Sequence, residues 1–170
     1  MQEFTSFAAF GRHLGRLALQ GDAVTERITE RTAAIIQDEA QAKIGVYQEA
    51  SGGFPAWAPL ADSTVADRIR QGFSPLEPLL RTGTLRDSYS STTSGGEAVI
   101  GSTSDIALWQ EQGTEHIPPR PVLGPAAFES KAKIGALGAS IMVAWLIGAP
   151  WRRLQGSKLP TIDSAIAPPT

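Results

Sequence analysis

The sequence predicts a small α+β protein, and three features of the chain support this class. Apolar residues recur at helical spacing through the first fifty residues or so. Residues 79–101 are rich in threonine, serine, tyrosine and valine and contain a glycine pair, which is typical of a hairpin. Residues 134–151 carry no charge and return to a helical pattern. We therefore expect a small antiparallel sheet packed by N-terminal helices and a long C-terminal helix.

The first part of the chain predicts two consecutive helices. An apolar stripe at helical spacing marks the first of them, at Phe7, Phe10, Leu14 and Leu17. Gly21 is expected to end this helix, and Asp22 is expected to cap a second, longer one. A third, short helix is expected between Thr64 and Gly72, because threonine and glycine are common at helix starts and ends.

The middle of the chain predicts a hairpin followed by a brief helix. We expect strands at Leu85–Thr93 and Glu97–Gly101, joined by a turn through the Gly95–Gly96 pair. Ser104 or Asp105 is then expected to cap a helix that ends at Gly113.

A proline-rich segment is expected to complete the sheet. Pro118, Pro119 and Pro121 favour extended geometry around Arg120–Leu123 and exclude a central strand position, so the segment is expected to be an edge strand. Pro125 then opens the last long helix. We expect one domain over residues 1–150 and a flexible C-terminal arm over residues 151–170, whose proline and small polar residues show no sustained period.

Composition excludes several classes of function. The chain of 170 residues has no cysteine, so disulfides, thiolate metal sites and cysteine nucleophiles are excluded. Its 15 basic and 17 acidic residues give a net charge of −2, which provides little drive for binding nucleic acid. No paired-histidine spacing or nucleophile motif occurs in the sequence, so we expect no cofactor, no metal site and no catalytic residue.

Two alternative functions stay open at this point. One is a hydrolase-type enzyme that uses His116 with Glu111 or Glu115, although Gly113 interrupts the helix between the two glutamates. The other is a membrane-associated protein that uses the uncharged run Ile134–Trp151, whose length is at the lower limit for a bilayer span.

Three segments in a fixed order carry a resemblance to a known family. They read "WAPLADSTVADRIRQG", "LLRTGTLRDSYSS" and "AVIGSTSDIALWQEQGTEHIPPRPVLGPA". In this order they resemble the virion morphogenesis, or tail-completion, family of tailed bacteriophages. The residues that carry the resemblance are Trp57, Pro59, Leu60, Thr82, Gly83, Leu85, Arg86, Ser88, Gly101, Gln112, Gly113, Ile117, Pro118, Arg120, Pro121, Leu123 and Gly124. The chain departs from the family pattern at Ile106, where the family commonly has tyrosine.

The resemblance implies a non-enzymatic structural protein at the neck or tail terminus of a virion, assembled in the host cytoplasm. It implies a homo-oligomeric ring of six copies that completes the tail or joins the tail to the head. The expected partners are adjoining head-connector and tail-tube or tail-terminator proteins, with DNA passing through the channel without specific binding and with no membrane involved. The expected interface residues are Arg81, Arg86, Trp109, His116, Pro118, Arg120, Pro121, Trp151, Arg152 and Arg153.

Overall fold

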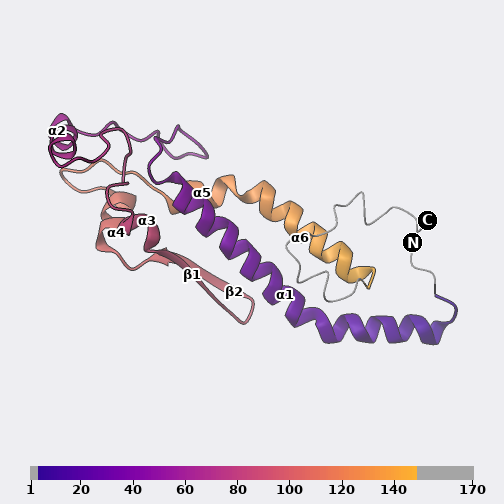
Figure 1. Cartoon of the computed structure of the whole chain (residues 1–170). Helices are drawn as coiled ribbons and strands as arrows, with labels where there is room; N and C mark the ends of the chain where they lie inside the picture. Colours follow the sequence, from indigo (N-terminus) through magenta and orange to yellow (C-terminus); the bar gives the residue numbers. More distant parts are fainter. Residues whose placement is uncertain (1–3, 149–170) are drawn as a thin grey trace. The chain divides into compact units, whose positions relative to one another are not determined.

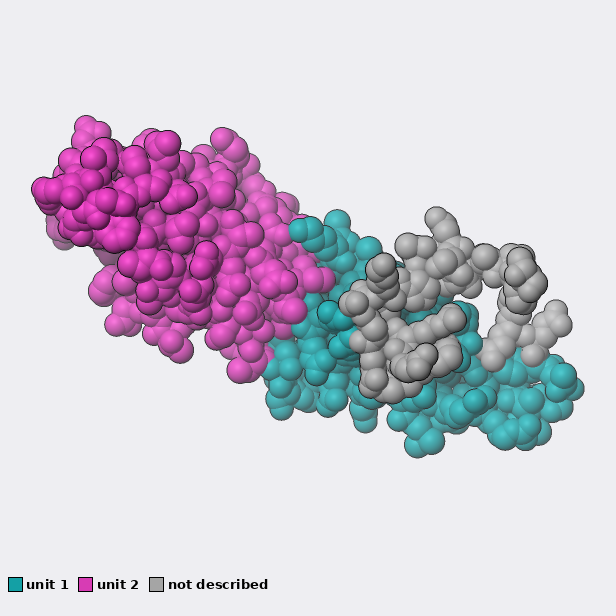
Figure 2. Space-filling model, in the orientation of Figure 1, with its two compact units in different colours: residues 1–32, 93–98, 132–170 teal, residues 33–92, 99–131 magenta. Residues whose placement is uncertain are grey.

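The computed structural model describes residues 4–148, and within them the chain forms six helices and one two-stranded antiparallel sheet (Figure 1). The predicted α+β class is confirmed, including a long C-terminal helix. The chain divides into two compact units (Figure 2). Unit 1 comprises residues 1–32, 93–98 and 132–170, and unit 2 comprises residues 33–92 and 99–131. The predicted arm, with Trp151, Arg152 and Arg153, lies outside the described residues.

Helix α1 runs without interruption over Phe7–Lys43, so the prediction of two helices divided at Gly21 is wrong. A glycine inside a helix costs only about 1 kcal/mol relative to alanine. The residues before Gly21, Leu17 to Gln20, are good helix formers, and a side chain at position 21 would meet no other atom within 4 Å. The local signal for a helix end is therefore too weak to stop α1.

The hairpin forms where the sequence predicts it, but its first strand is shorter. Strand β1 covers Tyr89–Ser94 and strand β2 covers Glu97–Ser102. The turn between them places Gly95 at φ 57° and Gly96 at φ 81°, and glycine adopts such positive φ angles without steric cost. The residues expected to begin the first strand instead form the one-turn helix α3 (Thr84–Asp87), which follows Gly83 at φ 88°.

The proline-rich segment is not a strand, which corrects the prediction of a third, edge strand at Arg120–Leu123. Within residues 4–148 the sheet contains only β1 and β2. The backbone N–H of Arg120 donates to the carbonyl of Gln110 at 2.6 Å, and the prolines beside it have no N–H to offer. The segment is therefore fastened to helix α4 (Asp105–Gln112) and cannot pair with a strand.

The remaining helices are α2 (Asp62–Arg70), α5 (Leu123–Glu129) and α6 (Lys131–Leu146). The one long helix expected from Pro125 onward is thus two helices, with the buried Ser130 between them. No helix within residues 4–148 has both the length and the apolar character needed to cross a bilayer.

Unit 2 has its own hydrophobic core. Its buried members come from the end of α1, the loop after it, the hairpin, α4 and α5, and they are Ala40, Ile44, Trp57, Tyr89, Ala107, Val122 and Ala126. Burial raises the pKa of the Tyr89 phenol, and the charge of Glu111 raises it further. The elements that carry the three family-like segments therefore share one core.

Unit 1 contains the first part of α1, the tip of the hairpin and most of α6. His13 is buried on α1, and its Nε2 lies 3.0 Å from the carbonyl oxygen of Leu146 at the end of α6. Beside this contact is an open apolar surface, which we call the apolar patch, formed by Phe10, Leu14, Leu146 and Ile147. All four of these side chains are exposed, and Leu14 has 48% of its surface open.

Candidate functional site

The three family-like segments meet in unit 2, although they are far apart in the sequence. The buried indole Nε1 of Trp57 donates to the carbonyl of Pro121 at 3.2 Å. The Arg120 guanidinium donates to the carbonyl of Ala58 at 3.2 Å and 3.0 Å, and to that of Pro59 at 3.1 Å. We call the loop that carries Trp57, Ala58 and Pro59 the tryptophan loop. It donates one hydrogen bond to the proline-rich segment and accepts others from Arg120 of that segment.

Two glycines of the proline-rich region are required by close backbone approach. Gly113 ends α4 at φ 74°, and a Cβ there would lie 2.9 Å from the carbonyl oxygen of Ile117. A Cβ on Gly124 would lie 2.5 Å from the Phe54 ring. Both positions therefore exclude larger residues unless their neighbours shift.

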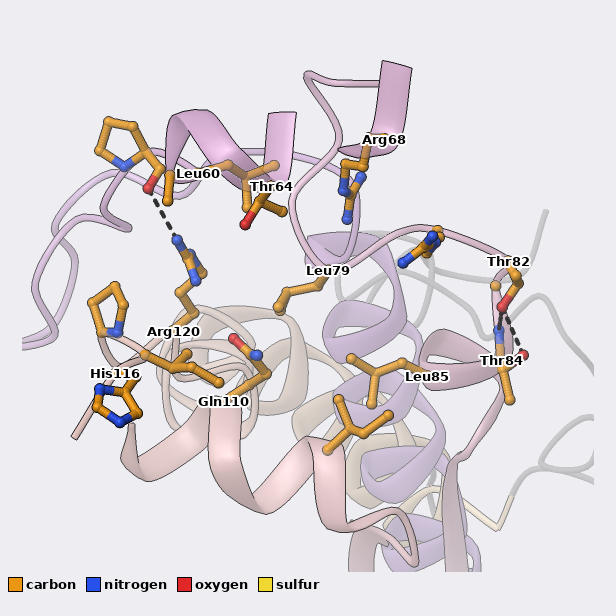
Figure 3. A pocket seen from close by; sticks show the side chains of 17 residues that line it. Leu60, Thr64, Arg68, Leu79, Thr82, Thr84, Leu85, Gln110, His116 and Arg120 are labelled. Atoms are coloured by element: carbon orange, nitrogen blue, oxygen red, sulfur yellow. Dashed lines mark hydrogen bonds between the residues drawn. The ribbon is translucent and has the colours of Figure 1, made fainter. Parts of the chain in front are cut away.

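Unit 2 contains a pocket of about 550 Å³, which we call the arginine pocket because Arg68, Arg81 and Arg120 line it. Its walls come from α2, α3, α4 and the loops beside them. In Figure 3, Arg120 and Gln110 approach the same space as Leu79. Among the described residues that line the pocket there is no aspartate or glutamate.

Two of the three arginines are buried and have no carboxylate partner among residues 4–148. Only 7% of Arg68 and 5% of Arg120 is exposed. Arg68 Nη1 donates to three backbone carbonyls, those of Ser74, Glu77 and Leu80, at 2.8–3.0 Å. In this part of the chain, no carboxylate lies within 4.0 Å of either guanidinium. Carbonyl dipoles therefore take the place of a counter-ion.

Burial lowers the pKa of the Arg120 guanidinium, and the positive charge of Arg68 lowers it further, while Tyr47 opposes the shift. Arginine nevertheless stays protonated in proteins. The pocket thus holds two like charges in a partly desolvated space, which is an arrangement that an anionic group would stabilise.

The loop that Arg68 holds is strained at Leu79. This residue has φ 63°, in the left-handed region that non-glycine residues rarely adopt. The hydrogen bonds from Arg68 to Glu77 and Leu80 lie on either side of it. The buried cation therefore fixes the wall of the pocket in which Leu79 lies.

The structure brings four of the predicted interface residues together, because Arg81, His116, Pro118 and Arg120 all line the arginine pocket. Arg81 is exposed, pairs with Asp67 at 3.3 Å, and lies over the Phe73 ring.

The other predicted residues within the described part of the chain lie outside this pocket. Trp109 is 49% exposed, whereas Pro121 is buried and accepts the hydrogen bond from Trp57. Arg86 is exposed, and its contact with Asp87 at 2.9 Å raises the pKa of the guanidinium, mainly through their hydrogen bond.

Glu111 binds backbone N–H groups at the start of α5, and it does not bind His116. Its Oε1 accepts hydrogen bonds from the backbone N–H groups of Val122 at 2.9 Å and Leu123 at 2.7 Å, at the start of α5. The His116 side chain is exposed, and within residues 4–148 no hydrogen bond joins its ring to either neighbouring glutamate. The same part of the chain has no cluster of three or more residues suited to hold a metal ion.

Sequence reasoning missed Arg68 and Gln110 as members of the site. Arg68 lies three residues after Val65 on α2, a spacing that places both on one side of the helix, and this was the available signal. Gln110 gave no signal, because its inward orientation depends on how α4 packs. Its Oε1 is buried without a hydrogen-bond partner among the described residues.

No protein-family model, curated protein or solved structure matches the chain. The family resemblance therefore rests on the three segments and on their order in the sequence.

Proposed function

We propose that this protein is a structural subunit of a tailed-phage virion. Six copies form a ring at the neck or tail terminus, and this ring completes the tail or joins it to the head. The observation that carries the proposal is the meeting of the three family-like segments in unit 2. Trp57 and Arg120 connect the first segment with the third. Arg68 of the first segment donates to the carbonyl of Leu80 in the second. Residues that carry the family resemblance thus contact one another within one unit of the fold.

The proline-rich segment supports a role in assembly. Its backbone is restricted by the prolines before and after Arg120, and it is fastened through Gln110 and Ala58. A segment that is ordered before it meets a partner loses less conformational entropy on binding. This edge of unit 2 is therefore suited to contact a neighbouring subunit, with Pro118 and His116 exposed beside it.

The apolar patch of unit 1 is a second surface suited to contact another copy. Phe10 and Leu14 on α1 and Leu146 on α6 leave 39%, 48% and 51% of their surfaces open. Contiguous exposed apolar side chains of this kind are typical of protein–protein contacts. When such a contact joins two different surfaces of identical subunits and its rotation closes, the product is a ring.

Replacement of Leu14 by glutamate tests this function. A buried carboxylate in an apolar contact is strongly unfavourable, so Leu14→Glu is expected to weaken self-association of the purified chain by at least about tenfold. Sedimentation velocity over a range of concentrations measures the effect. The matched control is Leu19→Glu, which alters an 88% exposed leucine further along α1, on another face of the helix.

The control variant should associate as the wild type does, and circular dichroism should show both variants folded. A wild-type chain that stays at 18.0 kDa at every concentration would contradict the proposed ring. Equal loss of association in both variants would show that the apolar patch is not part of the contact between subunits.

A further inference from the structure

The arginine pocket holds guanidinium donors that the described chain does not use. The hydrogen bonds of Arg68 all leave from Nη1, and those of Arg120 leave from Nε and Nη2. Among residues 4–148, the Nε and Nη2 of Arg68 and the Nη1 of Arg120 therefore have no acceptor. Both arginines line the pocket, and no described aspartate or glutamate lines it with them. An anion is the group that these donors would bind.

Apolar side chains form another part of the pocket wall. They are Leu60, Leu79, Leu85 and Ile106. A free inorganic anion would meet the guanidinium groups and leave these side chains in contact with water. A carboxylate flanked by aliphatic side chains would satisfy both parts of the pocket.

The rim of the pocket favours a segment of a polypeptide over a small carboxylic acid. Arg68 and Arg120 are buried, whereas Thr64, Ile106 and His116 around them are exposed and come from three separate parts of unit 2 (Figure 3). Half of the Ile106 surface is open, at 50%. A small acid held at the two cations would leave this rim uncovered, but a peptide segment that continues on both sides of its carboxylate would cover it.

Gln110 adds an unused acceptor to the same pocket. Its Oε1 is buried and accepts no hydrogen bond among the described residues. Turning the amide toward the pocket would allow this oxygen to accept a hydrogen bond from a ligand. The backbone N–H groups beside an acidic residue supply such donors, whereas a free aliphatic carboxylate has none. The ligand is therefore expected to contain peptide groups.

We propose that the arginine pocket binds an acidic peptide segment of a partner protein. The carboxylate of its aspartate or glutamate lies against the guanidinium groups of Arg68 and Arg120, and aliphatic residues on both sides of it cover the apolar walls. Every residue that lines the pocket belongs to unit 2, so the site is complete within that unit. The inference does not rest on the proposed virion role, and its test does not require ring formation.

Peptide binding to the full-length chain tests this proposal. The probes are fluorescein-labelled peptides with a central aspartate or glutamate, one alanine, valine, leucine or isoleucine on each side, and serine–glycine ends. Fluorescence anisotropy is expected to show saturable binding by members of this set. Their counterparts with a central asparagine or glutamine should bind at least about tenfold more weakly, because the charge-assisted hydrogen bonds of the carboxylate are lost.

A charge placed at the rim tests whether the peptide carboxylate meets the arginines. Thr64 is exposed, lines the pocket and lies four residues before Arg68 on α2, so a glutamate there reaches Arg68 and competes with the ligand. Thr64→Glu should therefore weaken binding at least about tenfold. The matched control is Thr64→Gln, which has the same length without the charge and should change binding by less than about twofold. Thermal melting should confirm that both variants are folded.

A second pair of variants tests the apolar part of the pocket. Ile106 and Leu108 are both on α4 and are 50% and 52% exposed, but only Ile106 lines the pocket. Ile106→Asn should weaken binding of the acidic peptides at least about fivefold, because a wall covered by the aliphatic flanks is lost. Leu108→Asn makes a similar change in the same helix and should leave binding unchanged.

The proposal is overturned if no peptide of the acidic set binds, or if the asparagine and glutamine counterparts bind as tightly. Equal binding by Thr64→Glu and Thr64→Gln, or equal binding by Ile106→Asn and Leu108→Asn, would also overturn it. Displacement of the peptide by an equal concentration of sodium acetate or sodium phosphate would do the same, because it would show that the pocket recognises an anion alone.

Discussion

Replacing Trp57 by alanine is expected to lower the free energy of unfolding of unit 2 by about 3–5 kcal/mol. Trp57 is buried in the core beside Ala40 and Tyr89, and its indole N–H donates to the Pro121 carbonyl. The variant loses the packing of the largest side chain in that cluster and leaves the carbonyl oxygen without its donor. Urea denaturation followed by circular dichroism measures the change.

Trp109→Ala is the matched control for this experiment. Trp109 is 49% exposed on α4 and does not belong to the core cluster. Its replacement should therefore change the free energy of unfolding by less than about 1 kcal/mol. A loss for Trp109→Ala as large as that for Trp57→Ala would show that burial in unit 2 is not as described.

Arg120→Met is expected to lower the free energy of unfolding by about 2–4 kcal/mol. Methionine fills much of the same space but cannot donate to the carbonyls of Ala58 and Pro59. These acceptors, on the half-buried Ala58 and the exposed Pro59, lose charge-assisted hydrogen bonds, and this loss outweighs the relief of repulsion between Arg120 and Arg68. The same denaturation measurement applies.

Arg70→Met provides the comparison at an exposed position. The Arg70 side chain is 73% exposed and pairs with Asp67 on the surface of α2, so its loss should cost less than about 1 kcal/mol. If Arg120→Met lowers the free energy of unfolding as little as Arg70→Met does, Arg120 does not hold the tryptophan loop. The hydrogen bonds from Arg120 would then not be what joins the first family-like segment to the third.

Local signals in the sequence predicted the elements that depend on local chemistry. The turn at Gly95–Gly96 and the end of α4 at Gly113 both require positive φ angles, which glycine adopts without cost, and both occur where predicted. The helix end expected at Gly21 does not occur, because a single glycine costs a helix only about 1 kcal/mol relative to alanine and α1 continues to Lys43.

Features set by distant partners could not be predicted in the same way. The proline-rich segment has the composition of an edge strand, but the Arg120 backbone N–H is bound by Gln110 on α4, so the segment never reaches the sheet. Arginine is also mostly exposed in proteins, so sequence reasoning placed Arg120 at a surface interface and passed over Arg68. Both are buried because backbone carbonyls from other loops surround them.

The proposed role as a virion subunit is tested most directly by mass spectrometry of purified tailed particles from a host that carries this gene. The proposal predicts peptides of this chain in every particle preparation, at six copies for each ring of a neighbouring neck protein. Intact, tailed, infectious particles that contain none of these peptides would contradict it.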